Sequence, residues 1–361
     1  DQTGDCRPLE HAAFAVSSRI ADLALNELRY NDRTPGIWLV PRKRSAPMKQ
    51  WKIEPVGERD RAAALALLLA SDNAADTAAQ VAQALERIAA GSADSQSLVW
   101  AHKVAGDQSS SAIGVCWIEG QAGNIGYLHP PVVDPVLPDR EQCEQELFAA
   151  AEAAARSAGA TWLQTLLDPL NTISPLLRRL GFEHVSTLVY QAALPSFAGR
   201  EPALMRIRPL PYTAAQRPLL VEILTATYEG SLDCPLLNGT RSAAETLASY
   251  ETIGQSGTRH WQLIYRANVP LGCLLLAVHT PDEAGASSFG ELVYWGVVPS
   301  ARGLGVGREI LELALWKATE LQLDKLVLAV DAANKPALRL YQELGFFEWL
   351  RKDAWGKQVP A

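Results

Sequence analysis

The stretch that decides the fold is residues 297–307, which read VVPSARGLGVG. Two β-branched residues lead into a proline and a glycine-rich turn, and residues 307–321 then have the apolar spacing of a helix packed on a sheet. Such a turn exposes backbone N–H groups at a helix N-terminus, where the helix dipole adds about half a positive charge. The stretch therefore predicts a strand, a turn and a helix that together bind a pyrophosphate group.

Residue identities disfavour two other phosphate-binding turns. A dinucleotide-binding turn needs a third glycine three residues after the second, and Arg308 and Ile310 stand at those places. The Lys-Ser/Thr pair of a P-loop is also missing from this turn. A glycine-rich turn alone is weak evidence, so its interpretation depends on a second pattern.

The second pattern is residues 334–346, which read NKPALRLYQELGF. Arg302-x-x-Gly305-x-Gly307 resembles the Gln/Arg-x-x-Gly-x-Gly/Ala signature of GNAT acyltransferases. Residues 334–346 are similar to the block that follows it in that family, Asn-x-x-Ala-x-x-Leu-Tyr-x-x-x-Gly-Phe. The resemblance implies that residues 204–361 form a catalytic acetyltransferase domain that uses acetyl-CoA as co-substrate.

The same resemblance implies roles for particular residues. Relatives often use a carboxylate on the fourth strand as base, which here is Glu291, and the tyrosine of the second signature as acid, which is Tyr341. Each has a structural alternative, since Glu291 could be an exposed carboxylate at a strand end and Tyr341 a core ring. The expected cofactor-binding residues are Val297, Val298, Arg302, Gly303, Leu304, Gly305, Val306, Gly307, Arg308 and Asn334.

The chain also contains an internal repeat at the scale of a domain. WKIEPV at residues 51–56 resembles MRIRPL at residues 205–210, and Leu-Gly-Phe follows a predicted helix at residues 180–182 and again at 344–346. Strands and one long helix lie between these landmarks in the same order. We expect an α+β fold of two tandem GNAT-like domains, each a mixed, mostly antiparallel sheet flanked by helices. This arrangement is similar to that of mycothiol synthases.

The first copy is expected to be degenerate. Prolines and carboxylates occupy the segment that corresponds to the glycine-rich turn, and they remove N–H donors and add negative charge. Aligning Val132-Val133 with Val297-Val298 puts Gly126 at the place of Glu291, and counting back from Leu-Gly-Phe puts Leu177 at that of Tyr341. The expected domains are an N-terminal extension (1–47), a degenerate domain (48–194), a linker (195–203) and the catalytic domain (204–361).

Residues 1–47 match neither copy. Residues 9–30 have helical spacing, and the prolines that follow them predict an extended tail. The first methionine is Met48, directly before the first predicted strand. We therefore expect the extension to be non-catalytic and dispensable.

Composition limits the class of protein. A hydrophobic fraction of 48% with 20% charged residues is typical of soluble globular proteins, and five scattered cysteines favour a reducing compartment. A net charge of −7 disfavours a nucleic-acid-coating surface, and no apolar run approaches the roughly 20 residues of a membrane span. No metal-ligand spacing is present. We expect a cytoplasmic protein, monomeric or homodimeric, with no metal and no nucleic-acid or membrane partner.

The expected acceptor is the primary amine of a small molecule. In relatives the loop between the first two helices lines the acceptor pocket, and the corresponding candidates for substrate binding are Tyr228, Asp233 and Asn238. A second domain beside the cleft favours small acceptors. Two alternatives stay open: an acetyltransferase acting on protein lysines or N-termini, and a non-catalytic acyl-CoA-binding module, which the presence of Glu291 and Tyr341 disfavours.

Overall fold

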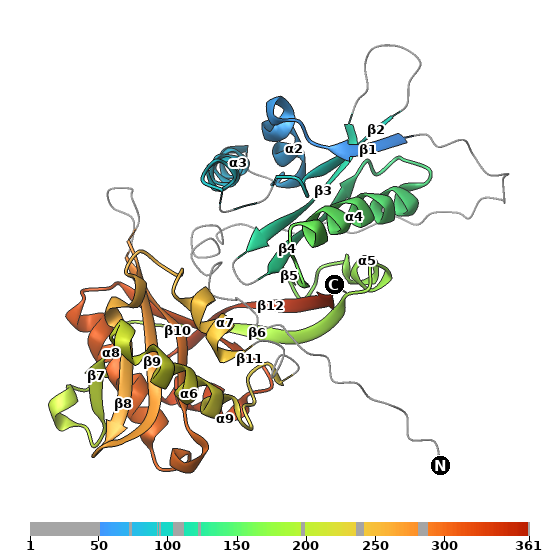
Figure 1. Ribbon diagram of the computed structural model, residues 1–361. Coiled ribbons are helices and arrows are strands. Elements are labelled where there is room, and N and C mark those ends of the chain that lie inside the picture. Colours follow the sequence, from blue (N-terminus) through green and yellow to red (C-terminus); the bar gives the residue numbers. More distant parts are fainter. Residues whose placement is uncertain are drawn as a thin grey trace, which may run out of the picture. The chain divides into compact units, whose positions relative to one another are not determined.

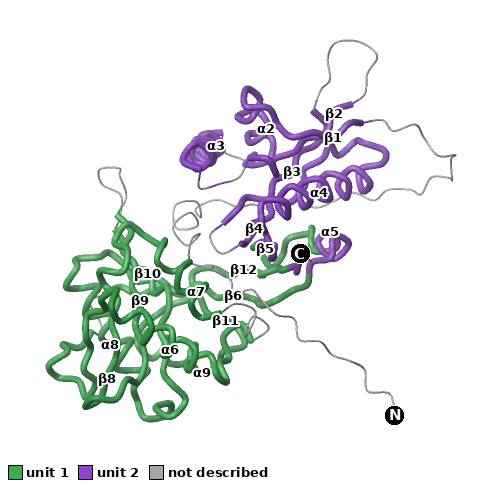
Figure 2. Tube along the Cα trace, in the orientation of Figure 1, with its two compact units in different colours: residues 1–25, 166–174, 183–356 green, residues 26–165, 175–182, 357–361 purple. Residues whose placement is uncertain are grey.

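The computed structural model describes residues 51–71, 74–91, 93, 95–103, 112–121, 124–195, 199–235, 242–280 and 288–359 (Figure 1). The expectations for residues 1–47 and for Asn238 lie outside this part of the chain. The described residues form two compact units (Figure 2). We call residues 166–174 and 183–356 unit 1, and residues 51–165, 175–182 and 357–359 unit 2.

Unit 2 contains a sheet in which each strand lies beside the next one along the chain. The strands are β1 (Trp51–Pro55), β2 (Val99–Lys103), β3 (Ala112–Gln121), β4 (Ile125–Val133) and β5 (Trp162–Leu167), whose last two residues are counted with unit 1. All pairs are antiparallel except β4 with β5. The helices are α2 (Arg61–Leu68), α3 (Ala74–Ala89), α4 (Arg140–Ser157) and α5 (Ser174–Arg179).

Unit 1 contains the second sheet. Its strands, in spatial order, are β7 (Arg208–Pro211), β8 (Gln262–Arg266), β9 (Val269–His279), β10 (Phe289–Val297), β11 (Lys325–Asp331), β6 (Glu183–Ala193) and β12 (Phe347–Gln358). Only β10 and β11 pair in parallel.

Four helices cover the two faces of the unit 1 sheet. Apolar residues of α6 (Arg217–Tyr228) and α7 (Ala243–Tyr250) share one buried cluster, and those of α8 (Val306–Glu320) and α9 (Lys335–Glu343) share another. Side chains alternate between the faces of a strand, so Cys273 and Leu275 face α6 and α7 while Leu274 and Leu276 face α8. The site residues can therefore be assigned to a face.

The expected α+β class, with a mostly antiparallel sheet, is confirmed. The strand expected at residues 51–56 and the helix expected at residues 307–321 are present as β1 (Trp51–Pro55) and α8 (Val306–Glu320). The strands after each Leu-Gly-Phe, β6 and β12, were not predicted. The strand β6 precedes the expected linker, yet it pairs with β11 and β12 in unit 1.

Strand register corrects one equivalence between the copies. In unit 1, Gly290 and Glu291 pair with Leu326 and Val327, whereas in unit 2 Gly126 and Tyr127 pair with Leu163 and Gln164. Tyr127, not Gly126, is therefore the counterpart of Glu291. The prediction was wrong by one residue because it aligned Val132-Val133 with Val297-Val298, whereas Val133 and Val297 hold the same place opposite Gly114 and Gly272.

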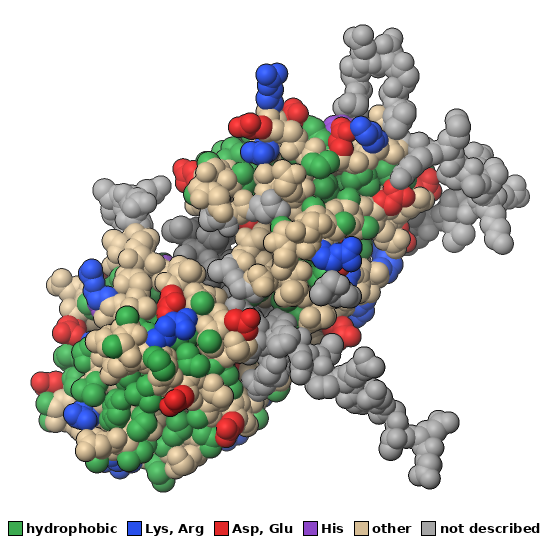
Figure 3. Space-filling view, viewed as in Figure 1, with side chains coloured by type: hydrophobic (Ala, Val, Ile, Leu, Met, Phe, Trp, Pro, Cys, Tyr) green, Lys and Arg blue, Asp and Glu red, His purple; other side chains and the backbone are tan. Residues whose placement is uncertain are grey.

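Within the described ranges, no helix is long and apolar enough to cross a membrane, and no three His, Cys, Asp or Glu side chains are grouped to hold a metal ion. On the face shown in Figure 3, acidic and basic side chains are interspersed over each unit.

Candidate active site

The two parallel strands of unit 1 part from each other. They pair only from Phe289 to Glu291 on β10 and from Lys325 to Val327 on β11. A bulge between Leu292 and Tyr294 then bends β10, which continues to Val297 against β9, while β11 continues against β6. The backbone edges of β10 and β11 that face each other beyond Glu291 thus do not pair. Their N–H and C=O groups can bond to an extended ligand between the strands.

The glycine-rich turn lies at the end of the bent strand. A 3₁₀ turn, η7 (Pro299–Ala301), leads into Gly303 and Gly305, which have φ values of +74° and +79°. Such left-handed angles favour glycine because a Cβ would clash with the backbone. Gly305 is the N-cap of α8, and the N–H groups of the three residues after it precede the first intrahelical bond, from Glu309 N to Gly305 O at 3.2 Å.

Gly307 brings α8 close to β10. A Cβ at this position would lie 3.2 Å from the Trp295 ring, so a larger residue would push the helix and the tryptophan apart. The N-terminus of α8 therefore lies beside the bent part of β10. This end of the helix combines N–H donors with a partial positive charge, which suits phosphate groups.

Arg302 makes three hydrogen bonds inside the protein. Its Nε donates to Val297 O at 3.1 Å, and its two terminal nitrogens donate to Thr227 O at 2.9 Å and Glu229 O at 2.6 Å. Two of these carbonyls belong to the C-terminal end of α6, where a cation is favourable. The guanidinium thus links α6 to the end of β10, and the contact with pyrophosphate expected of Arg302 stays a prediction.

A second arginine lies beside the turn. The Nη2 of Arg206 is 3.0 Å from the position that a Cβ on Gly305 would take, while its Nε donates to Glu309 Oε1 at 2.8 Å. Glu309 Oε2 accepts the N–H groups of Arg206 and Ile207 at 2.8 and 3.0 Å. The carboxylate in the first turn of α8 is therefore neutralised by Arg206, which sequence reasoning missed.

The two backbone N–H groups expected to bind the cofactor, those of Val297 and Val298, point in different directions. Val298 N donates to Leu271 O at 2.9 Å, so it is already used within the sheet. Successive N–H groups of a strand point to opposite sides, so that of Val297 points away from β9 and toward the opening. Arg308 forms an ion pair with Glu343 of α9, and Leu304 is exposed in the turn.

Tyr341 lies on the α8 and α9 face of the opening. Its hydroxyl oxygen accepts a hydrogen bond of 2.8 Å from Trp295 Nε1. An indole N–H only donates, so the tyrosine keeps its own hydroxyl proton for a different acceptor. Burial, with Asp233 as a further cause, raises the pKa of Tyr341 above its ordinary value. The side chain is thus a neutral proton donor at neutral pH.

Glu291 lies on the opposite face, at the last pair before the strands part. Its side chain has no solvent-accessible surface, and its Oε2 is 2.7 Å from His279 Nε2. The expectation that it might be an exposed carboxylate at a strand end therefore does not describe the structure. His279 was not among the predicted residues, because its partner lies twelve positions along the chain and only the β9–β10 register brings them together.

Asp233 and Asn334 meet at the end of β11. Asp233 Oδ1 accepts from Asp331 N at 2.7 Å, and Asn334 caps α9 by accepting from Ala337 N at 3.3 Å. Desolvation, with Asp331 nearby, raises the pKa of Asp233 to about 6. The bond from Asp331 N holds this carboxylate against the end of β11.

Tyr228 belongs to a group of aromatic rings on the α6 and α7 face. Its ring is 5.6 Å from that of Tyr294 in an edge-on arrangement, and Tyr250 stacks on Tyr294 at 5.9 Å. The Tyr294 hydroxyl is 2.8 Å from Thr227 Oγ1. Both predicted acceptor residues thus contact a strand that borders the opening, Tyr228 through Tyr294 of β10 and Asp233 through Asp331 N of β11.

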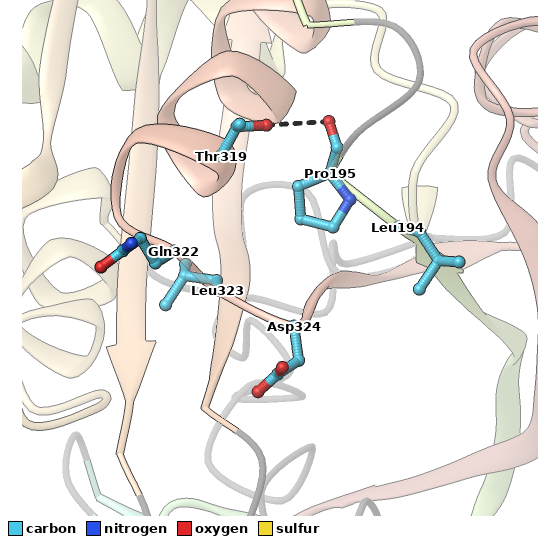
Figure 4. A pocket seen from close by; sticks show the side chains of 6 residues that line it. All are labelled: Leu194, Pro195, Thr319, Gln322, Leu323 and Asp324. Atoms are coloured by element: carbon cyan, nitrogen blue, oxygen red, sulfur yellow. Dashed lines mark hydrogen bonds between the residues drawn. The ribbon is translucent and has the colours of Figure 1, made fainter.

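A pocket of about 380 Å³ lies elsewhere in unit 1 (Figure 4). It lies at the C-terminal end of α8, where Thr319 Oγ1 donates to Pro195 O at 2.9 Å. A helix of 15 residues is about 22 Å long, so the pocket is far from the glycine-rich turn at the other end. Its lining residues are Leu194, Pro195, Thr319, Gln322, Leu323 and Asp324.

Part of the chain is similar to a known protein family. Residues 223–346 match the model of the acetyltransferase (GNAT) family. A mycothiol acetyltransferase of Thermobispora bispora is 38% identical over 87 residues, which is 24% of this chain and 30% of that protein. One of Acidothermus cellulolyticus is 37% identical over 90 residues, 25% of this chain and 26% of that protein. The chain thus spans less than a third of the length of these curated relatives.

A solved structure extends the likeness in fold. The GCN5-related N-acetyltransferase from Sphaerobacter thermophilus superposes with a TM-score of 0.57 at 15% identity, covering 88% of this chain and 98% of that one. At this level of identity the likeness concerns the fold alone.

Proposed function

We propose that this chain, whose residues 223–346 form a domain of the acetyltransferase (GNAT) family, is an acetyl-CoA-dependent N-acetyltransferase that acts on a primary amine of a small molecule. The observation that carries the proposal is the opening between β10 and β11, with Glu291 on one face, Tyr341 on the other and the N-terminus of α8 beside it.

The residues present fit the cofactor. The N–H groups of Val306, Gly307 and Arg308, together with the exposed guanidinium of Arg206, would hold its pyrophosphate. The unpaired edge of β10, including the N–H of Val297, would bind the pantetheine arm as a strand-like partner. When bound, acetyl-CoA supplies an activated acetyl thioester.

Two side chains would carry out the proton transfers of the reaction. An amine attacks only after it loses its proton, and Glu291 can accept that proton because its carboxylate lies where the strands part. Tyr341 holds a proton on its hydroxyl oxygen, oriented by Trp295, and can give it to a leaving thiolate. Each role is of the kind that contributes about 10²- to 10⁴-fold to rate. The acid and the base lie on opposite faces of the sheet, so they act on different atoms without competing.

The domain plan is also part of the proposal. We place the catalytic domain at residues 204–361 and a degenerate copy at 48–194. The turn before α4 supports this, because Pro135 and Pro138 lack N–H groups and Asp134 accepts a bond from Val136 N there.

The acceptor is expected to be small and to carry an amine. The curated relatives are named for acetylation of mycothiol, which supports an amine-bearing small molecule, and Asp233 would attract a cation. The test is release of thiol from acetyl-CoA against a panel of simple amines, amino sugars and peptides. We expect turnover with at least one small amine and its loss in Glu291→Gln. Turnover with peptides alone would favour a protein acetyltransferase, and acetyl-CoA binding without any turnover would contradict an enzymatic role.

A further inference from the structure

We propose that His279 is a positioning residue for the base, which holds the carboxylate of Glu291 ionised and in one orientation. The proposal rests on the proposed acetyl transfer and adds a residue to it. Nε2 of His279 lies 2.7 Å from Oε2 of Glu291, and the carboxylate side chain is wholly shielded from solvent.

The strand register makes this contact a fixed feature. His279 is directly opposite Phe289, and Glu291 follows Phe289 by two residues, so the histidine and the glutamate are diagonal neighbours on one face. Long side chains reach each other across such a diagonal. The ring of His279 also stacks on Phe289, with 4.6 Å between centroids and 13° between planes. The imidazole is thus held on one side by the ring and at Nε2 by the carboxylate.

Burial and hydrogen bonding act on Glu291 in opposite directions. Removal from water disfavours the charged form of a carboxyl group, whereas a donated hydrogen bond favours it. A base must be ionised before the amine arrives, so a wholly buried carboxylate needs such a donor. A hydrogen on Nε2 of His279 can supply this bond, and the contact also fixes the direction of the two carboxylate oxygens.

Other charged groups near this pair are placed differently. Lys325 of β11 lies beyond Phe289, with Nζ 5.5 Å from the ring centre, and burial lowers its pKa. The 3₁₀ turn η6 (Gly257–His260) packs on β9 and carries Arg259 and His260. Burial and then Lys317 lower the pKa of His260. The hydrogen-bond contact of 2.7 Å is made by His279.

The test uses two substitutions in the full chain. His279→Leu removes the donor, while His279→Gln keeps an N–H donor that does not titrate. A hydrogen bond to a charged group is worth about 10- to 100-fold, so His279→Leu should lower kcat/KM by that factor. Its acetyl-CoA affinity should stay within about twofold, and the acidic limb of its pH–rate profile should move to higher pH. His279→Gln should recover most of the loss.

A second pair in the same unit provides the control. His184 contacts Asp353 at 3.2 Å with 40% of its side chain exposed, so His184→Leu should leave both rate and profile unchanged. Wild-type kinetics in His279→Leu would overturn the proposal. Equal loss in the Leu and Gln variants would also overturn it, because a donor would then not be what matters.

One readout does not depend on activity. In chain labelled with 13Cδ-glutamate, with the Glu291 signal assigned by its absence from Glu291→Gln, the carboxyl group should titrate at higher pH in His279→Leu than in wild type. An unchanged titration would refute the inference about His279. Absence of acetyl transfer by wild type against the whole amine panel would instead count against the proposed function.

Discussion

Replacement of Arg302 by alanine separates two roles for this residue. In the structure its guanidinium donates to Val297 O, Thr227 O and Glu229 O, so the substitution should mainly destabilise unit 1. Hydrogen bonds to charged groups contribute about 1.5–3 kcal/mol each when buried and less when exposed. The residue is exposed and one bond lies at the surface, so the released carbonyls partly regain water. We expect a loss of about 2 kcal/mol in the free energy of unfolding.

The assay is denaturant unfolding without ligand, followed by calorimetric titration with acetyl-CoA. Arg308→Ala, in the first turn of α8, is the control for stability, because its ion pair with Glu343 is exposed and such pairs contribute about 0–1 kcal/mol. If Arg302→Ala keeps wild-type stability but binds acetyl-CoA tenfold more weakly, the guanidinium contacts the cofactor and the structural role is refuted.

Three further outcomes are expected. Gly305→Ala should lower the free energy of unfolding by about 1–2 kcal/mol and weaken acetyl-CoA binding, because a residue at φ +79° gains a Cβ that lies 3.0 Å from Arg206 Nη2. Unchanged binding would contradict the assignment of this turn as the phosphate site. Burial tends to raise the pKa of Glu309, but bonds from Ile207 and Arg206 lower it below 4.5. Its contribution to stability is therefore present above pH 4.5 and is lost as pH falls through the folded-state pKa. Glu309→Gln should flatten this acidic part of the plot of unfolding free energy against pH, and an unchanged plot would contradict the reasoning. Tyr341→Phe should reduce kcat by about 10²-fold or more at unchanged acetyl-CoA affinity. The free energy of unfolding should fall by about 1 kcal/mol, because Trp295 Nε1 loses its acceptor. Near wild-type turnover, with chemistry rate-limiting, would show that Tyr341 is not the acid.

Local patterns were sufficient for most of the fold. The apolar spacing of residues 307–321 predicted a helix, which is found as α8. Glycine at positions 303 and 305 predicted the turn, since few other residues adopt its backbone angles. These features depend on neighbours along the chain.

Long-range pairing was not predictable in the same way. The placement of β6 between β11 and β12 joins segments more than 130 positions apart, and nothing in the run of Glu183–Ala193 specifies those partners. Likewise, the bond between His279 and Glu291 depends on strand register. The contacts of Arg302 with α6 depend on packing.

An arginine beside a glycine-rich turn can bind either a phosphate group or the carbonyl oxygens at a helix C-terminus, because both carry negative charge. The sequence could therefore propose Arg302 as a ligand but could not choose between the two. Its motif position identified where the residue lies, while the orientation of its guanidinium required the structure.

Calorimetric titration of the full chain with acetyl-CoA tests the central claim most directly. The N-terminus of α8 offers free N–H donors beside an opened strand pair, whereas the segment before α4 carries prolines and carboxylates. We predict one acetyl-CoA bound per chain. Two equivalent sites, or no binding at all, would contradict the account.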